Sequence, residues 1–157
     1  MRKLALFALA FGIAAPLATL TPAGAASTVP VPFTVLATSS QSGYPLAPSD
    51  RVIVRKRMYD LVWSQHGGTP ANQPPVDFST DMVVASFMGF QPTSGYFFTV
   101  NSVTTDGAKV DVFLDDVSPG PNCNVLFVIT SPAIFVKIPK LGLPVFVHHN
   151  GVVTNCP

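Results

Sequence analysis

The sequence contains no glutamate, and charged residues of all kinds make up only 11 % of it. Nine Lys and Arg stand against eight Asp, which gives a formal net charge of +1. A balance this close to neutral offers no electrostatic footprint for nucleic acid or for an acidic membrane surface. Few charges, with 16 Pro and 11 Gly, suit short strands and turns far better than long helices. We therefore predict a β-rich protein without a nucleic-acid partner.

The common catalytic signatures are also missing: no H-E-x-x-H, no G-x-S-x-G and no Gly-rich phosphate loop occurs in the chain. Of the three histidines, His148 and His149 are adjacent on an expected strand, so they point to opposite faces and do not chelate one metal ion. His66 falls at the end of an expected helix, where the dipole favours its charged form. We interpret all three as structural or surface residues.

The aspartates form only two clusters. Asp77 and Asp81 flank a short polar segment and are typical of a turn ahead of a strand. Asp115 and Asp116 lie at the end of an expected hairpin strand, with Asp115 on its outward face. The sequence therefore predicts no catalytic residue, no metal and no cofactor. An enzyme built from scattered Asp and His, either a hydrolase or a metal-binding enzyme, remains as an alternative.

No apolar run is long enough for a membrane-spanning helix, which needs about 20 residues. The N-terminus instead has a basic start, an apolar stretch over 4–15 and the small residues Ala23-Gly24-Ala25. These are the parts of a secretory signal peptide. We predict a signal peptide at 1–25, a single domain at 26–157, and a secreted or periplasmic protein with no membrane anchor after cleavage.

There are only two cysteines, Cys123 and Cys156, and both follow the predicted signal peptide. An even pair without metal-type spacing in an oxidising compartment is most simply one disulfide. A reactive thiol pair is the alternative, although no Cys-x-x-Cys is present. A disulfide would also hold the last residues of the chain in place.

The hydrophobic pattern predicts a mainly β fold, with about eight or nine short strands in a sandwich-like or curved antiparallel sheet and one packed helix. The helix is expected over about 55–65, where Met58, Leu61 and Val62 recur at helical spacing, and Gly67 should end it. Strands are expected at 31–38, 51–54, 82–90, 96–104, 108–116, 125–129, 134–138, 145–149 and 152–156.

Three of these strand predictions carry further detail. The stretch 82–90 is apolar on both faces and should be a central strand covered on each side. The 96–104 and 108–116 strands should form a hairpin with a three-residue loop, Val100 opposite Val112 and Phe98 facing the core while Phe97 faces away. The last two strands flank Asn150-Gly151, a strong signal for a two-residue hairpin turn. Residues 115–124 are expected to be an irregular connection.

One stretch combines turn chemistry with aromatic crowding. Pro presets one dihedral, Ser and Thr bond locally, and Gly permits a positive φ. Apolar side chains beside an ordered loop make a docking surface; the structural alternative is a plain turn whose aromatics are covered by another element. The candidate partner-binding residues are Gly89, Phe90, Gln91, Pro92, Thr93, Ser94, Gly95, Tyr96 and Phe97.

Several ordered motifs resemble the PrcB C-terminal domain family, over roughly residues 76–140. The name of that family comes from a non-catalytic subunit of a surface protease complex, so the resemblance implies an exported accessory domain with a protein partner, for which a protease is the candidate. The family's lipid-anchoring cysteine has no counterpart here. The motifs are Val76-Asp77-Phe78-Ser79, Asp81-Met82-Val83-Val84, Phe87-Met88-Gly89, Pro92-Thr93-Ser94-Gly95-Tyr96, Pro119-Gly120, Thr130-Ser131-Pro132 and Val136-Lys137-Ile138-Pro139-Lys140.

The segment 92–96 is also similar to the N-P-T-T-G-Y loop of chagasin-type cysteine-protease inhibitors, immunoglobulin-like sandwiches that wedge this loop into an active-site cleft. Gln91 stands where they have Asn, and Ser94 replaces Thr. Their companion R-P-W loop is absent, since the only Trp is Trp63. We therefore predict a secreted non-enzymatic binding module, with protease inhibition as the alternative and an enzyme as the third hypothesis.

Overall fold

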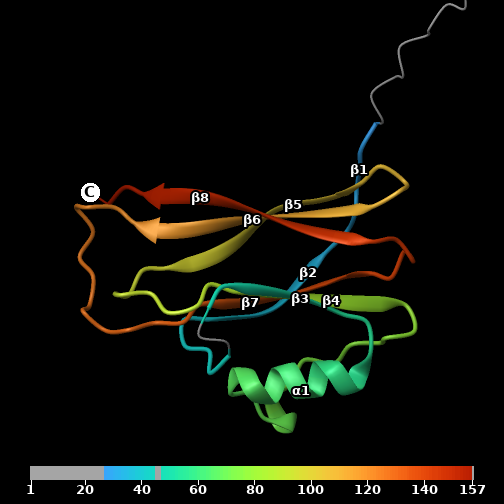
Figure 1. The fold of residues 1–157 in the computed structure, drawn as a ribbon, viewed down its shortest axis with the longest axis horizontal. Helices are drawn as coiled ribbons and strands as arrows, with labels where there is room; N and C mark the ends of the chain where they lie inside the picture. Colours follow the sequence, from blue (N-terminus) through green and yellow to red (C-terminus); the bar gives the residue numbers. More distant parts are fainter. Residues whose placement is uncertain (1–26, 45–46, 157) are drawn as a thin grey trace, which may run out of the picture.

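The computed structural model describes residues 27–44 and 47–156. Over these residues the protein is a sandwich of two four-stranded sheets, with one helix packed on the outer face of one sheet (Figure 1). The mainly β fold with a single packed helix is therefore confirmed. The predicted signal peptide at 1–25 lies outside the described residues.

The elements follow one another along the chain without internal repetition. In order they are β1 (Val29–Pro30), β2 (Thr34–Ser39), β3 (Ser49–Ile53), α1 (Lys56–His66), a 3-10 turn (Pro70–Asn72), β4 (Asp81–Phe87), β5 (Phe97–Thr105), β6 (Val110–Pro119), β7 (Ala133–Pro139) and β8 (Val145–Thr154).

The two sheets divide the strands without regard to their order in the sequence. The first sheet has the order β1-β5-β6-β8 and the second has the order β2-β7-β4-β3. Neighbouring strands are antiparallel except β6 and β8, which are parallel. In Figure 1 the second sheet lies between the first sheet and α1, so it is covered on both faces.

Strand β4 shows why the second sheet is central. Its side chains alternate between two cores: Met82 and Val84 face the other sheet, while Val83, Ala85 and Phe87 belong to the cluster that includes the helix. All five are buried. The predicted central strand, apolar on both faces, is confirmed.

Helix α1 also agrees with its prediction to within one residue. Its buried face, Tyr59, Val62, Trp63 and His66, packs on the second sheet. Gly67 ends the helix with φ of 102°, a left-handed conformation that glycine adopts without the steric cost of a Cβ.

The β5–β6 hairpin exists, but its predicted register is wrong. Val100 lies opposite Leu114 rather than Val112, and Val103 takes the place opposite Val112. A bulge between Val100 and Ser102 switches the face on which later residues point. The predicted burial nevertheless holds, because Phe98 is buried and Phe97 is exposed.

The turn of this hairpin explains the register. Asp106 Oδ1 accepts hydrogen bonds from the backbone N–H of Ala108 and of Lys109, and Thr105 Oγ1 donates to the Lys109 carbonyl. Such side-chain bonds favour a longer loop, so four residues, 106–109, separate the last pair, Thr105 and Val110. The prediction of a three-residue loop did not take these side-chain hydrogen bonds into account.

The predicted hairpin at Asn150-Gly151 is wrong. Residues 145–154 form the single strand β8, which pairs with β6 from Val110↔Val145 to Pro119↔Thr154. The φ angle of Gly151 is not positive, whereas the expected turn requires a positive φ at this residue. A ten-residue parallel ladder satisfies more backbone groups than a hairpin of two five-residue arms, and Asn150 Nδ2 donates to Asp115 Oδ1 of β6.

Two further predictions before β7 are wrong. Residues 115–119, expected in an irregular connection, continue β6 to Pro119. The expected buried strand at 125–129 has no regular structure, and Leu126 through Ile129 are exposed. The apolar run misled the prediction because its backbone groups bond to the loop after β4 and not to a sheet strand.

Cys123 and Cys156 form the predicted disulfide, 33 residues apart in sequence. It joins the connection after β6 to the end of β8, so the C-terminal strand is held to its neighbour at that point. Within the described ranges, no helix is long and apolar enough to cross a membrane.

Candidate functional site

The predicted binding stretch, 89–97, consists of most of the loop that connects the two sheets and of the first residue of β5. It follows β4 of the second sheet and leads into β5 of the first, so it is not the hairpin turn considered as its alternative. Gly89 has φ of 69°, and a Cβ there would lie 3.0 Å from Pro48 Cδ. Gly95 has φ of 93°. Both positions therefore favour glycine for backbone reasons.

A second segment, residues 125–130, is hydrogen-bonded to this stretch; we call the two segments, 89–97 and 125–130, the paired loops. Gln91 and Thr130 exchange two backbone bonds of 2.8 and 3.0 Å. Ser94 N–H donates to the Leu126 carbonyl, and Leu126 N–H donates to Ser94 Oγ. Thr130 Oγ1 donates to the Thr93 carbonyl at 2.8 Å. These contacts fix the two loops relative to each other.

The paired loops display an unusual amount of apolar surface. Phe127 is 94 % exposed and Leu126 is 71 % exposed. Single exposed apolar residues are ordinary, whereas large exposed apolar patches are a general feature of interaction sites. The exposed large apolar residues of the paired loops are Phe90, Phe97, Leu126, Phe127, Val128 and Ile129.

The nine predicted binding residues do not share one environment. Phe90, Pro92, Gly95 and Phe97 are exposed, while Gly89 is buried. The other four are partly covered: Thr93 and Ser94 bond to the second loop, and Gln91 and Tyr96 line a cavity beside it.

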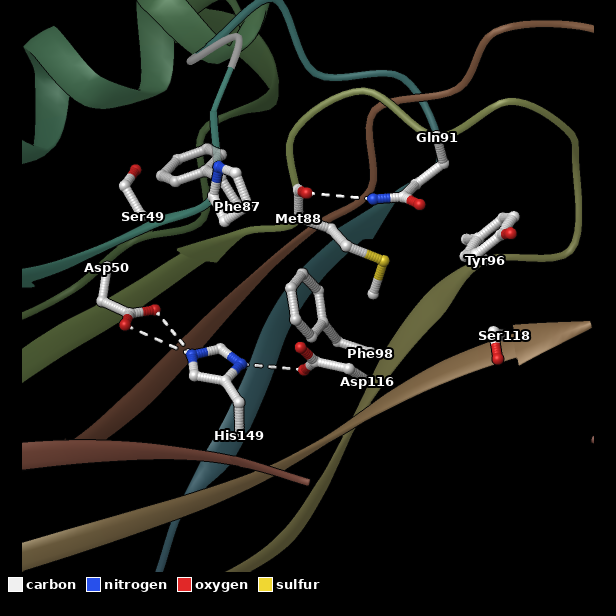
Figure 2. A pocket seen from close by; sticks show the side chains of 11 residues that line it. Ser49, Asp50, Phe87, Met88, Gln91, Tyr96, Phe98, Asp116, Ser118 and His149 are labelled. Atoms are coloured by element: carbon white, nitrogen blue, oxygen red, sulfur yellow. Dashed lines mark hydrogen bonds and ion pairs between the residues drawn. The ribbon is translucent and has the colours of Figure 1, made fainter. Parts of the chain in front are cut away.

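This cavity, of about 500 Å³, opens between the two sheets next to the paired loops (Figure 2). Its volume lies within the range of small-ligand pockets, about 300–1,000 Å³. Its lining residues come from β3, β4, β5, β6, β8 and the loop after β4. They are Pro48, Ser49, Asp50, Phe87, Met88, Gln91, Tyr96, Phe98, Asp116, Ser118 and His149.

His149 lies between two carboxylates in this cavity, as Figure 2 shows. Its Nδ1 is 2.8 Å from Asp116 Oδ1, and its Nε2 is 3.2 Å from each oxygen of Asp50. Asp116 and His149 belong to the first sheet, while Asp50 belongs to β3 of the second. The imidazole therefore bridges the two sheets, and both its nitrogens can donate hydrogen bonds to these carboxylates only when it is protonated.

The pKa of His149 reflects two opposing effects. Burial, the largest single effect, lowers the pKa, but the hydrogen bonds and negative charges of Asp116 and Asp50 together outweigh it and raise the pKa above its usual value. His66 shows the opposite outcome: burial lowers its pKa, and its Nδ1 contacts only the Ser42 hydroxyl at 2.9 Å. The predicted influence of the helix end on His66 is smaller than the effect of burial.

The cavity brings together a histidine and two aspartates, as the enzyme hypothesis requires, but the contacts are those of an ion pair. Ser118 Oγ donates to the Val152 carbonyl, and Ser49 Oγ has no hydrogen-bond partner among the described residues. Within residues 27–44 and 47–156, neither serine is hydrogen-bonded to His149. The part of the chain that the structure describes contains no group of three or more His, Cys, Asp or Glu placed to hold a metal ion.

The predicted opposite orientation of the two adjacent histidines agrees with their contacts. His148 Nε2 is 2.8 Å from Asp111, and its ring stacks on Phe113 with centroids 4.7 Å apart. His149 points into the cavity. No local pattern marks the Asp50–His149–Asp116 cluster, because its members are far apart in sequence and meet through the parallel pairing of β8 with β6 and the packing of β3 from the second sheet.

Taken together, these features define a β-sandwich with a paired-loop surface and an adjoining acidic cavity at one end. Comparison with known families adds a second level: residues 82–139 match the PrcB C-terminal family, which confirms the predicted resemblance over that range. The match runs from β4 to β7 and includes both paired loops, whereas Asp50 and His149 lie outside it. Neither the curated proteins nor the solved structures gave a match.

Proposed function

We propose that this protein is a secreted, non-enzymatic accessory module that binds an extracellular protease through the paired loops. One observation carries the proposal: two loops from distant parts of the chain are bonded to each other and expose their large apolar side chains to solvent. Such side chains lose their contact with water only when another molecule covers them.

The energy available from this surface is adequate for a specific partner. Covering one large apolar side chain is worth about 1.5–3 kcal/mol, and Phe127 and Leu126 are both largely uncovered. Binding residues of this kind dominate interfaces when they enter a pocket on the partner. The surface therefore supplies anchors for a protein, which can offer such pockets.

The hydrogen bonds between the loops also favour binding. Loops that must become ordered on binding lose part of the interaction energy to that ordering. Here Gln91 and Thr130 are joined by two backbone bonds, and Ser94 and Leu126 are joined by one backbone bond and by one bond from the Leu126 N–H to Ser94 Oγ. The preformed backbone reduces that cost, and the aromatic side chains have few rotatable bonds to restrict.

The family resemblance supports the kind of partner. The match at residues 82–139 covers the strands that carry the paired loops. Because the family takes its name from a non-catalytic subunit of a protease complex, a protease is the partner that the resemblance supports best. We place the protein outside the cytoplasm because of its predicted leader and because its two cysteines form a disulfide.

Inhibition of a protease is a second candidate, favoured by one observation. Residues 92–96, which are similar to the inhibitory loop of chagasin-type proteins, lie at the end of a two-sheet sandwich, as an inhibitory wedge would require. Here the neighbouring loop carries Phe127 in place of an R-P-W segment. An accessory subunit leaves its protease active, whereas an inhibitor stops turnover, so the two candidates can be separated.

Site-specific photo-crosslinking tests the surface directly. Benzoylphenylalanine is placed at position 127 in the full chain, expressed with its leader in the producing cells. The matched control carries the same group at position 146, where Phe146 is also exposed but lies on β8. We expect an exported protease to be crosslinked from position 127 and not from position 146. Identical products from both positions would contradict the proposal.

Reconstitution with the captured protease completes the test. Phe127→Ala should lower the affinity at least about tenfold, whereas Phe146→Ala should leave it unchanged. Turnover of a peptide substrate at saturating wild-type protein should stay equal or rise. A loss of turnover would assign the surface to inhibition, and equal affinities for both variants would remove the paired loops from the interface.

A further inference from the structure

The cavity beside the paired loops has walls of two kinds. Phe87, Met88 and Phe98 are buried apolar residues, and Tyr96 adds a further ring. Beside them, in Figure 2, the Asp50–His149–Asp116 cluster forms a polar wall. A site of this composition fits a ligand with an apolar part and one polar group of defined charge.

The charge of the polar wall selects the sign of that group. With His149 protonated the cluster carries one net negative charge, and with His149 neutral it carries two. Among the described residues, no Lys or Arg lines the cavity. An anion would meet both carboxylates and no free cation, so repulsion excludes it.

The polar wall also has unused acceptors. His149 Nδ1 contacts only one oxygen of Asp116, which leaves Oδ2 without a hydrogen-bond partner among the described residues. The carboxylates of Asp50 and Asp116 are both partly exposed, and each oxygen has two lone pairs. They can therefore also accept hydrogen bonds from a ligand that donates several, as ammonium and guanidinium groups do.

The aromatic lining suits the same class of ligand. The Phe98 ring lies 6.0 Å from the His149 ring in an edge-on arrangement, so an aromatic ring already stands beside the charged cluster. Rings of Tyr and Phe attract cations through their faces and also cover an apolar stem. Hydrophobic contact and charge therefore act on one bound molecule.

We propose that the cavity binds an ammonium or guanidinium group carried on an apolar stem. Such a group can belong to a free amine or to a basic side chain of a protein. The second source rests on the proposed function, since Gln91 and Tyr96 of the paired loops line the cavity and a partner bound there could insert a Lys or Arg. The first source is independent of it.

Protonation of His149 should weaken this binding. The charged groups that face His149 are Asp50 from β3 and Asp116 from β6, with the Phe98 ring as an uncharged neighbour. A neutral imidazole donates through only one nitrogen and so releases one carboxylate for the ligand. The affinity for a cation should therefore rise between pH 5.5 and pH 8, whereas a neutral ligand should show no such change.

The first experiment uses three isosteric probes with the full mature chain: 2-phenylethylamine, 2-phenylethanol and phenylacetate. Titrations are followed by ¹⁵N–¹H NMR at pH 8. We expect the amine to bind at least about tenfold more tightly than the alcohol, with shifts at Tyr96, Phe98 and Asp116. Equal affinities for amine and alcohol, tighter binding of phenylacetate, shifts elsewhere only, or no amine binding at about 10 mM would overturn the proposal.

Two matched variants locate the charge. Asp116→Asn keeps the shape but removes the charge from the cavity, and should weaken the amine at least about tenfold while leaving the alcohol unchanged. Asp115→Asn makes the same change one residue away, where Asp115 contacts Asn101 and Asn150, and should have no effect on the amine. Equal losses in both variants would contradict a specific site. If Asp116→Asn does not fold, the pH dependence of amine binding to the wild-type protein decides the question.

The last arm separates the two sources. The captured protease is assayed with the protein in the presence of saturating phenylethylamine. Competition with the protease would assign the cavity to a basic side chain of the partner, and unchanged protease binding would assign it to a free amine. Either result keeps the cation site, which only the probe titrations can overturn; failure of the proposed function would appear instead in the crosslinking from position 127.

Discussion

Two regions of this molecule combine aromatic rings with a histidine, and they behave in opposite ways. The first, the helix layer, consists of Tyr59, Trp63, His66, Phe87 and Phe135 between α1 and the second sheet, and all five are buried. The second is the open end of the sandwich, formed by the paired loops and the cavity with His149. The same residue types stabilise the fold in one place and are accessible to ligands in the other.

Charge and backbone pairing account for the difference. In the helix layer no carboxylate is bonded to His66, so burial alone lowers its pKa and the neutral form is favoured. At the open end two carboxylates outweigh burial and favour the charged form of His149. Phe90, Phe97 and Phe127 lie on the paired loops, which are hydrogen-bonded to each other, and their side chains are exposed.

The largest difference should appear when one Phe is removed from the helix layer. Phe135 is fully buried, and its ring lies 5.0–6.4 Å from those of Tyr59, Trp63, His66 and Phe87. Phe135→Ala should lower the free energy of unfolding by about 3–5 kcal/mol, because it leaves a cavity in a packed core. Urea denaturation measures this, and a loss below about 1 kcal/mol would show that the layer is loosely packed.

Local sequence patterns were sufficient to predict those elements whose structure follows from which of their own side chains are apolar. The helix at 56–66 and the strand at 81–87 follow from periodicity, and the inward Phe98 follows from alternation. The errors arose where the structure depends on pairing with a strand that is distant in the sequence. The bulge after Val100 is signalled only by the change of face between Phe98 and Val103, and the parallel pairing of β8 overrode a strong turn signal at Asn150-Gly151.

The site was accordingly predicted in part. Turn chemistry identified 89–97, but the partner loop at 125–130 was expected to be a buried strand because its residues are apolar. The polar wall of the cavity is built from Asp50, Asp116 and His149, which lie on three different strands. Nothing in the sequence around His149 indicates which aspartates it contacts. Pairing between distant strands, which sequence periodicity does not encode, positions these residues.

The second prediction concerns how each region is held together. The helix layer is held by packing, whereas Cys123 and Cys156 tie the end of β8 to the connection that leads into the second paired loop. Closing a loop of 33 residues is worth about 4 kcal/mol in the chain-entropy model. The double variant Cys123→Ser with Cys156→Ser should lose about 2–4 kcal/mol of stability in denaturant titrations.

Hydrogen exchange gives that variant a regional control. Amides in residues 145–154 should exchange faster than in the wild-type protein, relative to amides in 56–66. Uniform acceleration in both segments would show that the disulfide stabilises the whole domain and not the open end in particular. The wild-type protein kept in reductant should reproduce the double variant.

The third prediction uses the opposite pKa shifts of the two histidines. Because the folded-state pKa of His149 is raised, its contribution to stability is present below the unfolded value of about 6.5 and is lost as pH rises through the folded pKa. Because that of His66 is lowered, its contribution is present above about 6.5 and is lost as pH falls. The free energy of unfolding should thus decline both above and below a pH of about 6.5.

Each slope can be at most about 1.4 kcal/mol per pH unit, the limit for one proton. His149→Gln should remove the decline on the alkaline side and leave the acidic side unchanged, while His66→Gln should flatten the acidic side down to about pH 5, above the range of the carboxylates. Urea midpoints measured from pH 5 to 8.5 test this. A decline above pH 6.5 that persists in His149→Gln would show that the ion pair between the sheets does not cause it.

The smallest effect on stability is expected from Phe127→Ala, which is the same substitution as Phe135→Ala but at an exposed position. Phe127→Ala removes the same atoms from a side chain that is 94 % exposed, so it should alter the free energy of unfolding by no more than about 0.5 kcal/mol. Its effect on the affinity for the captured protease should nevertheless be at least about tenfold. If Phe127→Ala destabilised the fold by several kcal/mol, Phe127 would have to be covered in the folded protein. The open end would then be a second core and not a surface for a partner.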